Sequence, residues 1–296
     1  MLTVMTGGTK GIGRVAAALI AGQDDGVRIM GARPAADVPA GWTAAPLDLA
    51  SLASVHGFAA RLPDAPIDRL ILNAGGQLPS VRQRTADGFE ATFATNHLAH
   101  YLLLRLLMPR LAPDARIVIT SSGTHDPAEK TGVPPPRHAD ARLLAHPETD
   151  PALDRMSATA GMRAYASSKL CNMMTAQALA ASPEAAANHW RVFAYDPGLT
   201  PGTGLVRNQP WVVRMLLWPL LPLAVRWSRT MNRLDDAGRG LFDLATTATA
   251  PGDRVYAALR KARLTWPDPS ELARDDVAVR RLWADSAALV GLDPTP

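Results

Sequence analysis

Cysteine is almost absent from this chain: Cys171 is the single cysteine among 296 residues. One cysteine excludes an intramolecular disulfide and argues against a structural zinc site, so we expect a reducing compartment and a cytoplasmic location. The thiol fits a small buried apolar residue better than a reactive group.

Lysine is scarce as well, since only four of the 31 basic residues are lysines. The arginines are scattered, and no basic run is dense enough to line a nucleic-acid groove. We therefore predict no nucleic-acid partner. The net charge of +4 suits a phosphorylated small molecule equally well.

Long apolar runs are also missing. The most apolar stretch, residues 211–227, is interrupted by two arginines and two prolines, which makes it a poor membrane-spanning helix. The chain starts with an apolar strand at residues 2–5 and shows no basic segment followed by a long apolar one. We therefore expect no secretory signal.

The sequence does contain a regular alternation of strand and helix patterns. Short apolar strands separated by helices predict βαβ units and a parallel sheet covered on both faces. The predicted fold class is α/β, a doubly wound Rossmann-type sheet in a single domain over residues 1–296. Expected strands lie at 2–5, 27–32, 42–46, 69–72, 116–120 and 191–195, and expected helices at 12–21, 51–61, 85–111, 163–181 and 270–289.

Proline is concentrated in three places, at residues 133–136, 147–151 and 218–222. The polar, proline-rich segment 123–160 is long for a connection, so we expect an inserted loop with little regular structure. We find neither an internal repeat nor a linker to a second domain.

A glycine-rich turn follows the first strand and opens the first helix. Glycines here let the backbone turn tightly and approach a pyrophosphate at the positive end of the helix. The spacing, Gly7-x-x-x-Gly11-x-Gly13, differs from the common G-x-G-x-x-G pattern. The turn also contains Thr9, Lys10 and Ile12.

The end of the second strand bears on the choice between NAD and NADP. An NAD site usually has an acidic residue there, but this strand ends in Ile29-Met30-Gly31-Ala32-Arg33. Two cations, Arg33 and Lys10, and no carboxylate favour a 2′-phosphate, which predicts NADP(H). The alternative is that both are solvated surface charges.

Tyr165 and Lys169 lie one helical turn apart, so they share a face of their helix. A phenol with a pKa near 10 is a poor acid or base at neutral pH. An ammonium roughly 4 Å away should lower that pKa by roughly 2–3. Taken alone, the spacing is a weak signal and is more typical of an ordinary surface pair.

Together with other motifs, the pair resembles the short-chain dehydrogenases/reductases. The shared features occur in the family's order over roughly residues 1–200: the glycine turn, Asp48-Leu49, Asn73-Ala74-Gly75, Asn96, Ser121-Ser122, Tyr165-x-x-x-Lys169 and Pro197-Gly198. Residues 95–103 and 165–172 resemble retinol-dehydrogenase-like members. Residues 281–286 are similar to a segment that this group shares with protochlorophyllide reductases.

The resemblance implies a role for each matching residue. Tyr165 would be the acid or base, Lys169 would tune it and hold the nicotinamide ribose, Ser122 would bind the substrate oxygen, and Asn96 would hold a proton-relay water. The implied cofactor-binding residues are Gly7, Thr9, Lys10, Gly11, Ile12, Gly13, Arg33, Asp48, Leu49, Asn73, Ala74, Gly75, Tyr165, Lys169, Pro197, Gly198, Thr200 and Thr203.

Three departures from the family pattern leave alternatives open. Ser122 and Tyr165 are 43 positions apart (165 − 122), so the insert must loop out between them. Ser121 is a rival to Ser122. Position 202 is Gly where the family often has Thr, so Thr200 and Thr203 are both candidates for the contact to the nicotinamide amide.

Two histidines, His97 and His100, could suggest a metal because they are spaced i, i+3 on a helix. No carboxylate lies within the same turn, and we predict no catalytic metal.

The segment from 199 to about 234 is expected to be a substrate lid. It contains Trp211, Trp218 and Trp227 among aliphatic residues, which favours an apolar substrate. The alternatives for residues 211–227 are a contact with a second subunit in a homodimer and a peripheral membrane contact.

The predicted function is NADP(H)-dependent hydride transfer that interconverts an alcohol and a carbonyl on an apolar small molecule. One alternative is NADPH-dependent reduction of a C=C bond. The other is a non-catalytic NADP(H)-binding sensor or scaffold, which the retained Tyr165 and Lys169 disfavour.

Overall fold

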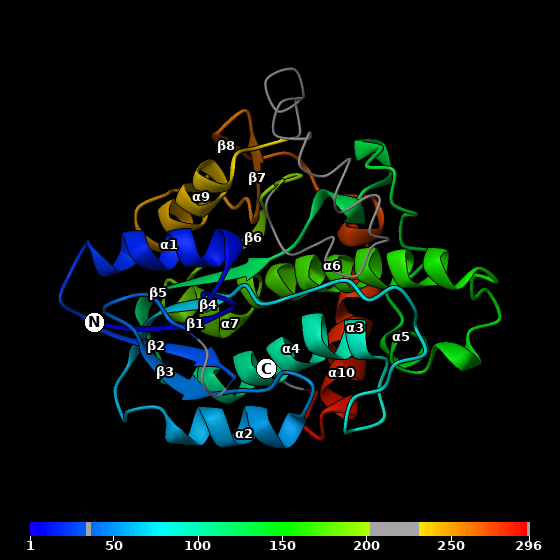
Figure 1. Cartoon of the computed structure of the whole chain (residues 1–296), viewed down its shortest axis with the longest axis horizontal. Helices are drawn as coiled ribbons and strands as arrows, with labels where there is room; N and C mark the ends of the chain where they lie inside the picture. The colour runs from blue at the N-terminus through cyan, green and yellow to red at the C-terminus, as the bar shows by residue number, and fades with distance from the viewer. Residues whose placement is uncertain (34–36, 202–230, 295–296) are drawn as a thin grey trace.

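The apolar segments of the chain form one twisted sheet, which the computed structural model describes together with the rest of residues 1–33, 37–201 and 231–294 (Figure 1). Within this part of the chain the strand order is β3-β2-β1-β4-β5-β6-β7-β8, parallel except for β8, which is antiparallel to β7. The strands are β1 Leu2–Thr6, β2 Val27–Ala32, β3 Thr43–Pro46, β4 Ile67–Leu72, β5 Leu111–Thr120, β6 Arg191–Asp196, β7 Tyr256–Arg260 and β8 Arg263–Thr265.

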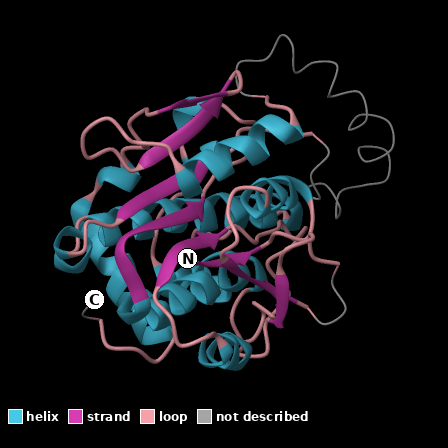
Figure 2. Cartoon of the chain, turned by 90° about the vertical axis from the view of Figure 1, so that its left-hand side faces the viewer, coloured by secondary structure: helices cyan, strands magenta, loops and turns pink. Residues whose placement is uncertain are grey.

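Helices cover both faces of this sheet, as Figure 2 shows. The described α-helices are α1 Gly11–Ala21, α2 Leu52–Arg61, α3 Ala91–Phe93, α4 Ala99–Leu107, α5 Ala141–Ala145, α6 Ser157–Ala180, α7 Pro183–Ala187, α9 Leu234–Thr246 and α10 Asp276–Leu289. The predicted doubly wound α/β fold is confirmed.

The two faces carry separate apolar cores because side chains alternate along each strand. Met5 of β1 and Ile71 of β4 point to the face covered by α1 and α9. Val4 and Leu70, their neighbours, point to the face covered by α2, α4, α6 and α10. Burial on both faces explains why the strands are continuous apolar runs.

The strand order reverses between β1 and β4, so the crevice at their carboxyl ends is a topological switch point, where ligands of open α/β sheets bind. The register aligns these ends: Thr6 pairs with Gly31 of β2 and with Leu72 of β4. Leu72 in turn pairs with Ile119 of β5. The residues that follow these strands therefore gather at one edge.

The predicted helix over 85–111 is wrong at both ends and in its middle. Glu90 starts it at Ala91, because its carboxylate accepts hydrogen bonds from the amides of Thr92 and Phe93 at 2.9 and 2.7 Å. Residues Ala94–Leu98 form a π-helical turn, η1, between α3 and α4. The helix ends at the 3₁₀ turn Met108–Arg110, and the next strand begins at Leu111.

Other boundaries also differ from the prediction. Helix α6 begins at Ser157, six residues before the expected Arg163. The expected helix over 270–289 is a 3₁₀ turn and then α10, because the side chain of Asp275 caps a new helix at the amides of Val277 and Ala278. The elements α7, α9, β7 and β8 were not predicted.

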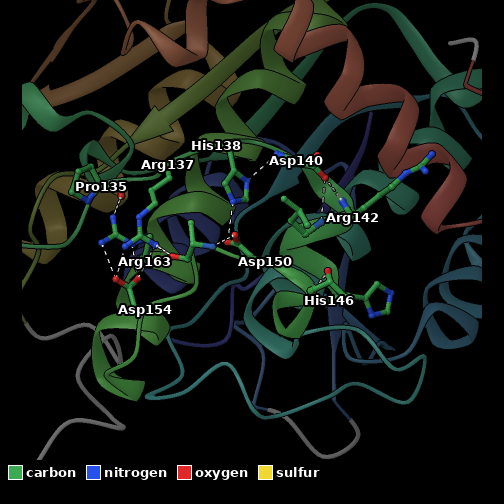
Figure 3. A network of polar contacts seen from close by, with 12 residues as sticks. Pro135, Arg137, His138, Asp140, Arg142, His146, Asp150, Asp154 and Arg163 are labelled. Atoms are coloured by element: carbon green, nitrogen blue, oxygen red, sulfur yellow. Dashed lines mark hydrogen bonds and ion pairs between the residues drawn. The ribbon is translucent and has the colours of Figure 1, made fainter.

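The segment 123–160 contains only short helical pieces before α6, held by ion pairs that Figure 3 shows. Asp154 pairs with Arg137 at 2.6 Å and with Arg163 of α6 at 2.7 Å. Asp140 pairs with Arg281 of α10 at 2.7 Å. These contacts fix the segment against the two helices.

Most of the expected lid, including Trp211, Trp218 and Trp227, lies outside the described residues. Among the helices that the structure describes, none has both the length and the apolar character needed to cross a membrane. Cys171 is buried and unpaired in α6.

Candidate active site

The glycine-rich turn after β1 packs directly against the segment after β4. Gly7 has a φ of +71°, and a Cβ there would lie 2.5 Å from the backbone nitrogen of Ala74. A Cβ at Gly13 would lie 2.1 Å from the carbonyl oxygen of Gly7. The side-chain amide of Asn73 donates to that same oxygen at 2.9 Å. Side chains larger than hydrogen cannot be accommodated at either glycine.

The amino end of α1 opens at this turn without a side-chain cap. Its N-cap residue, Lys10, makes no capping hydrogen bond, and the first turn contains no acidic residue. Free backbone amides at a helix N-terminus suit an anion. The residues present therefore fit a pyrophosphate held by Gly11, Ile12 and Gly13, as an NADP(H) site requires.

Two cations border this turn. Arg33 follows the last residue of β2 and is exposed, as is Lys10. Within the described residues neither side chain forms an ion pair. Asp48, also exposed, and the half-buried Leu49 follow β3 at the same edge of the sheet.

Tyr165 and Lys169 lie on the buried face of α6, with exposed fractions of 7% and 3%. The side chain of Ser122 lies near enough to the Tyr165 phenol to act on its pKa. The Nζ atom of Lys169 donates to the carbonyl oxygen of Thr120 at 3.0 Å. The ends of β5 and the middle of α6 thus bring a phenol, a hydroxyl and an ammonium together.

The structure separates the two serines after β5. The hydroxyl of Ser121 is buried and donates to the backbone oxygen of Lys169 at 2.9 Å. Ser122 is half-buried, and its hydroxyl also accepts a long hydrogen bond from the amide of Thr124 at 3.3 Å. Ser122 rather than Ser121 therefore faces the phenol.

The expected lowering of the Tyr165 pKa is wrong. Burial raises the pKa of the phenol to about 12, although the side chain of Ser122 opposes the increase and the charge of Asp196 adds to it. Burial also lowers the pKa of Lys169 to about 8, against the charge of Asp196. Removing the phenol from water disfavours its charged form, and at this burial that effect outweighs the attraction of the nearby ammonium.

Asn96 lies in the π-helical turn η1 and bridges α4, α6 and the loop after β4. Its side chain accepts from the amide of Gly76 and donates to the carbonyl of Gly76, both at 2.9 Å. It also donates to the hydroxyl of Ser168 at 3.0 Å. The extra residue of a π turn re-aims the helix locally, which is typical of functional positions.

Gly75 completes this corner of the site. A Cβ there would lie 3.2 Å from Oδ1 of Asn96 and 3.3 Å from Nζ of Lys169. Asn73, Ala74 and Gly75 therefore run past both the glycine-rich turn and Lys169.

The turn after β6 contains Pro197 and Gly198, the latter with a φ of +69°. Thr200 is buried, and its hydroxyl lies 3.4 and 3.3 Å from the carbonyl oxygens of Pro197 and Gly198. Thr203, the other candidate for the nicotinamide contact, lies outside the described residues.

Comparison with known proteins identifies the family. A family model described as short chain dehydrogenase matches residues 2–132. Over 318 residues the chain is 30% identical to protochlorophyllide reductase B, chloroplastic, of Oryza sativa subsp. japonica, covering 98% of this chain and 77% of that protein. The chain belongs to the short-chain dehydrogenase family.

Solved structures agree on the fold of this short-chain dehydrogenase. An uncharacterized protein from Mycobacterium Paratuberculosis has a TM-score of 0.71 at 27% identity, covering 100% of this chain and 95% of that one. A short chain dehydrogenase from Burkholderia cenocepacia J2315 in complex with NADP has a TM-score of 0.60 at 21% identity, covering 86% and 95%. At the latter identity the likeness shows the fold alone. The chain is an oxidoreductase by its family.

A hydrogen-bond network behind the site of this short-chain dehydrogenase was not predicted from the sequence. The hydroxyl of Thr6 accepts from the amides of Asn73 and Ala74 at 3.1 Å and bonds Nε2 of His100 at 2.9 Å. Nδ1 of His100 bonds the carbonyl oxygen of Asn96 at 3.0 Å, so that nitrogen carries the proton. This network connects the glycine-rich turn with the π turn.

His97 and His100 are both buried in the apolar interior. Burial lowers the pKa of His97 to about 3 and that of His100 to about 4. Within the described residues no group of three potential ligands could hold a metal ion. His97 bonds the hydroxyl of Ser286, and His100 that of Thr6, both at 2.9 Å.

Asp196 was also missed, although it directly precedes the Pro-Gly pair. It is 1% exposed and pairs with Arg260 of β7 at 2.8 Å. A carboxylate among apolar strand residues was visible in the sequence. Its partner, 64 positions later, was not, because β7 was not predicted.

Proposed function

We propose that the chain is an NADP(H)-dependent oxidoreductase that interconverts an alcohol and a carbonyl on an apolar small molecule. The observation that carries the proposal is the grouping of the Tyr165 phenol, the Ser122 side chain and the ammonium of Lys169, which stands 5.7 Å from the centroid of the Tyr165 ring. Two hydroxyls that meet at the carboxyl edge of the sheet can bind one substrate oxygen between them. A substrate oxygen bound in this way can belong to a carbonyl or to an alcohol.

Tyr165 is the proton donor in the reducing direction. Its raised pKa keeps the phenol protonated at neutral pH, so the proton is available to the substrate oxygen. Ser122 holds that oxygen and keeps it aligned. Lys169 holds a ribose hydroxyl and supplies the positive charge that makes loss of the phenol proton less costly.

Asn96 and Thr200 have supporting roles in this proposal. The carbonyl oxygen of Asn96, which His100 fixes, would accept a hydrogen bond from a relay water next to Lys169. Thr200, or Thr203, would contact the nicotinamide amide beside Pro197 and Gly198.

NADP(H), when bound, supplies or accepts the hydride. Gly7, Thr9, Lys10, Gly11, Ile12 and Gly13 would hold its pyrophosphate and adenosine ribose, and Asp48 and Leu49 would flank its adenine. Arg33 and Lys10 favour NADP over NAD because they are exposed cations and because β2 ends in Ala32-Arg33 without the carboxylate that an NAD site usually has there. Asn73, Ala74 and Gly75 would line the nicotinamide ribose.

A second candidate function is NADPH-dependent reduction of a C=C bond. It is supported by the relative whose name is protochlorophyllide reductase, which aligns over 98% of this chain. Such a reaction still needs the proton of Tyr165, but the substrate need not place an oxygen on Ser122. The two reactions therefore differ in how much they depend on Ser122.

A panel of apolar aldehydes, ketones and enones with NADPH tests the proposal, with products identified by NMR because both reductions add two hydrogens. We expect alcohols as products, and a loss of rate of about a hundredfold or more in Ser122→Ala. Saturated ketones from enones, with Ser122→Ala near the wild-type rate, would establish the second candidate instead. NADPH binding without turnover on any compound would indicate a sensor.

A further inference from the structure

A buried carboxylate joins the two turns that border the proposed reaction centre. Oδ1 of Asp196 accepts a hydrogen bond from the amide of Gly198 at 2.9 Å. A Cβ at Gly123 would lie 3.1 Å from Oδ2, so the residue after Ser122 packs against the same carboxylate. Asp196 thus touches both the Ser122 turn and the Pro197–Gly198 turn.

Arg260 holds this carboxylate in place. Its Nη1 atom lies 2.8 Å from Oδ2 of Asp196, and its Nη2 atom lies 2.7 Å from Oε1 of Glu129 in the 3₁₀ turn Pro127–Glu129. The two carboxylates and one guanidinium leave a net charge of −1. Ion pairs that are removed from water keep a fixed geometry when their hydrogen bonds are satisfied.

A second path runs from Asp196 to the backbone of Ser122. The hydroxyl of Tyr256 donates to Asp196 at 3.3 Å, and the ring of His125 packs edge-on against Tyr256 with centroids 5.1 Å apart. Nδ1 of His125 bonds the carbonyl oxygen of Ser122 at 2.7 Å. Both paths end on the turn that presents the Ser122 hydroxyl.

The ammonium of Lys169 needs a negative charge nearby, because it is 3% exposed and a buried unpaired ammonium is costly. Within residues 1–33, 37–201 and 231–294 it forms no ion pair with a carboxylate. The titratable groups around it are Tyr165 of α6, His100 of α4 and Asp196 of β6, with Arg260, Glu129 and His125 behind Asp196. Nζ of Lys169 donates to the carbonyl oxygen of Thr120, and Thr120 pairs with Tyr195 of β6, so that Asp196 is the next residue along the neighbouring strand. Of these groups, Asp196 is the carboxylate whose charge raises the pKa of Lys169.

We propose that Asp196 is a positioning residue for the Tyr165–Lys169 pair. Clamped by Arg260, it holds the Ser122 turn and the Pro197–Gly198 turn in register and supplies the negative charge that balances the Lys169 ammonium. The proposal rests on the proposed function for its kinetic consequences and is independent of that function for its electrostatic ones.

The electrostatic part can be measured without cofactor or substrate. The chain has four lysines, of which Lys10, Lys130 and Lys261 are exposed, so ¹³C-lysine labelling gives four side-chain signals. Lys169→Arg assigns the fourth. We expect the Lys169 signal to titrate at a pH lower by about half a unit or more in Asp196→Asn, because a nearby negative charge is lost.

Arg260→Gln should shift the titration of Lys169 in the opposite direction. This variant leaves both carboxylates and removes the positive charge between them, so Lys169 should titrate at a higher pH than in the wild type. General loosening of the site would move the titration in the same direction in both variants. An unchanged Lys169 titration in Asp196→Asn, or equal signs in the two variants, would overturn the proposal. Should Asp196→Asn fail to fold, the direction of the Lys169 titration shift in Arg260→Gln alone still tests the proposal.

Asp24→Asn is a matched control. Asp24 also accepts from a glycine amide two residues later, Gly26 at 2.9 Å, and pairs with arginines Arg28 and Arg69. It precedes β2 and lies at the amino edge of the sheet, away from the site. Its loss should lower stability and leave the Lys169 titration unchanged.

The kinetic part uses the best substrate of the panel. Asp196→Asn should lower kcat/KM by about tenfold or more, because Ser122 loses its fixed position, and move the alkaline limb of the pH profile to lower pH. A kcat/KM and a limb that both match the wild type would refute the positioning role. If the wild type turns over nothing, the proposed function fails, and the lysine titration still decides the charge balance.

Discussion

The Nζ atom of Lys169 stands over the ring of Tyr165, 5.7 Å from its centroid. The two residues come from one helix, yet their distance to Ser122 and Thr120 depends on how α6 packs against the end of β5. In the proposed function this packing places a proton donor, its tuning charge and an oxygen-binding hydroxyl around one point.

Tyr165→Phe removes only the transferable proton. We expect turnover to fall by about 10²–10⁴-fold while NADPH binding, measured by fluorescence, stays as in the wild type. Tyr101→Phe is the control, because the Tyr101 hydroxyl bonds the backbone of Trp283 in α10 and the side chain of Arg105 rather than any proposed site residue. Near-wild-type rates in Tyr165→Phe would reject the assignment.

Arg33 and Lys10 should set the cofactor preference. A charge-assisted contact contributes roughly 1.5–3 kcal/mol, so two of them should favour NADPH over NADH by on the order of a hundredfold or more in kcat/KM. Arg33→Ala should reduce that ratio by about tenfold or more. Arg280→Ala, an exposed arginine on α10, should leave it unchanged. A ratio near one in the wild type would show that both are plain surface charges.

Gly13→Ala should damage the cofactor site through sterics alone. Its Cβ would lie 2.1 Å from the oxygen of Gly7 and 2.6 Å from the side chain of Asn73, so the turn must move. We expect loss of NADPH binding and about 1–3 kcal/mol of destabilisation. At Gly22, on the other end of α1, the nearest atoms would be 3.7 and 3.8 Å away. Gly22→Ala that binds as weakly as Gly13→Ala would refute the steric explanation.

Acid should unfold this protein through its buried histidines. His97 and His100 have pKa values of about 3 and 4 in the folded chain, below the ordinary 6.5. At a pH between these folded values and 6.5, the unfolded chain therefore binds more protons than the folded chain. Their contribution is complete above pH 6.5 and is lost as pH falls toward 4. Each should cost about 1.4 kcal/mol per pH unit in that window, measured by urea unfolding.

His97→Gln isolates one of these terms. Glutamine is neutral at every pH, so the variant's stability curve should be flatter than that of the wild type below pH 6.5. His56→Gln, at an exposed position on α2, should keep the wild-type slope. Parallel slopes in His97→Gln and the wild type would mean that His97 does not contribute to acid unfolding.

Much of the fold could be predicted because its signals are local. The strands at 27–32 and 191–195 are short apolar runs, and their bounds matched the structure to within one residue. The prediction of a helix over 85–111 was wrong for a reason that is also local but leaves only a weak pattern in the sequence. One buried carboxylate, Glu90, caps the helix six residues late, and periodicity alone does not reveal a cap.

The elements near the carboxyl end failed for a different reason. Strand β7 is five residues long, and Ala257 and Ala258 in it carry little strand preference. It forms because Ala194, Tyr195 and Asp196 of β6 offer it an edge to pair with. Such a strand is defined by its neighbour more than by its own residues.

The sequence by itself determined the glycine spacing, the Tyr165–Lys169 turn of helix and the alternation of strands with helices, because each depends on a few adjacent residues. Tertiary structure alone decided which serine faces the phenol, how Asn96 is aimed and that Asp196 meets Arg260. It also reversed the sign of the Tyr165 pKa shift. Burial and long-range partners control these features, and neither is encoded in any short stretch of the chain.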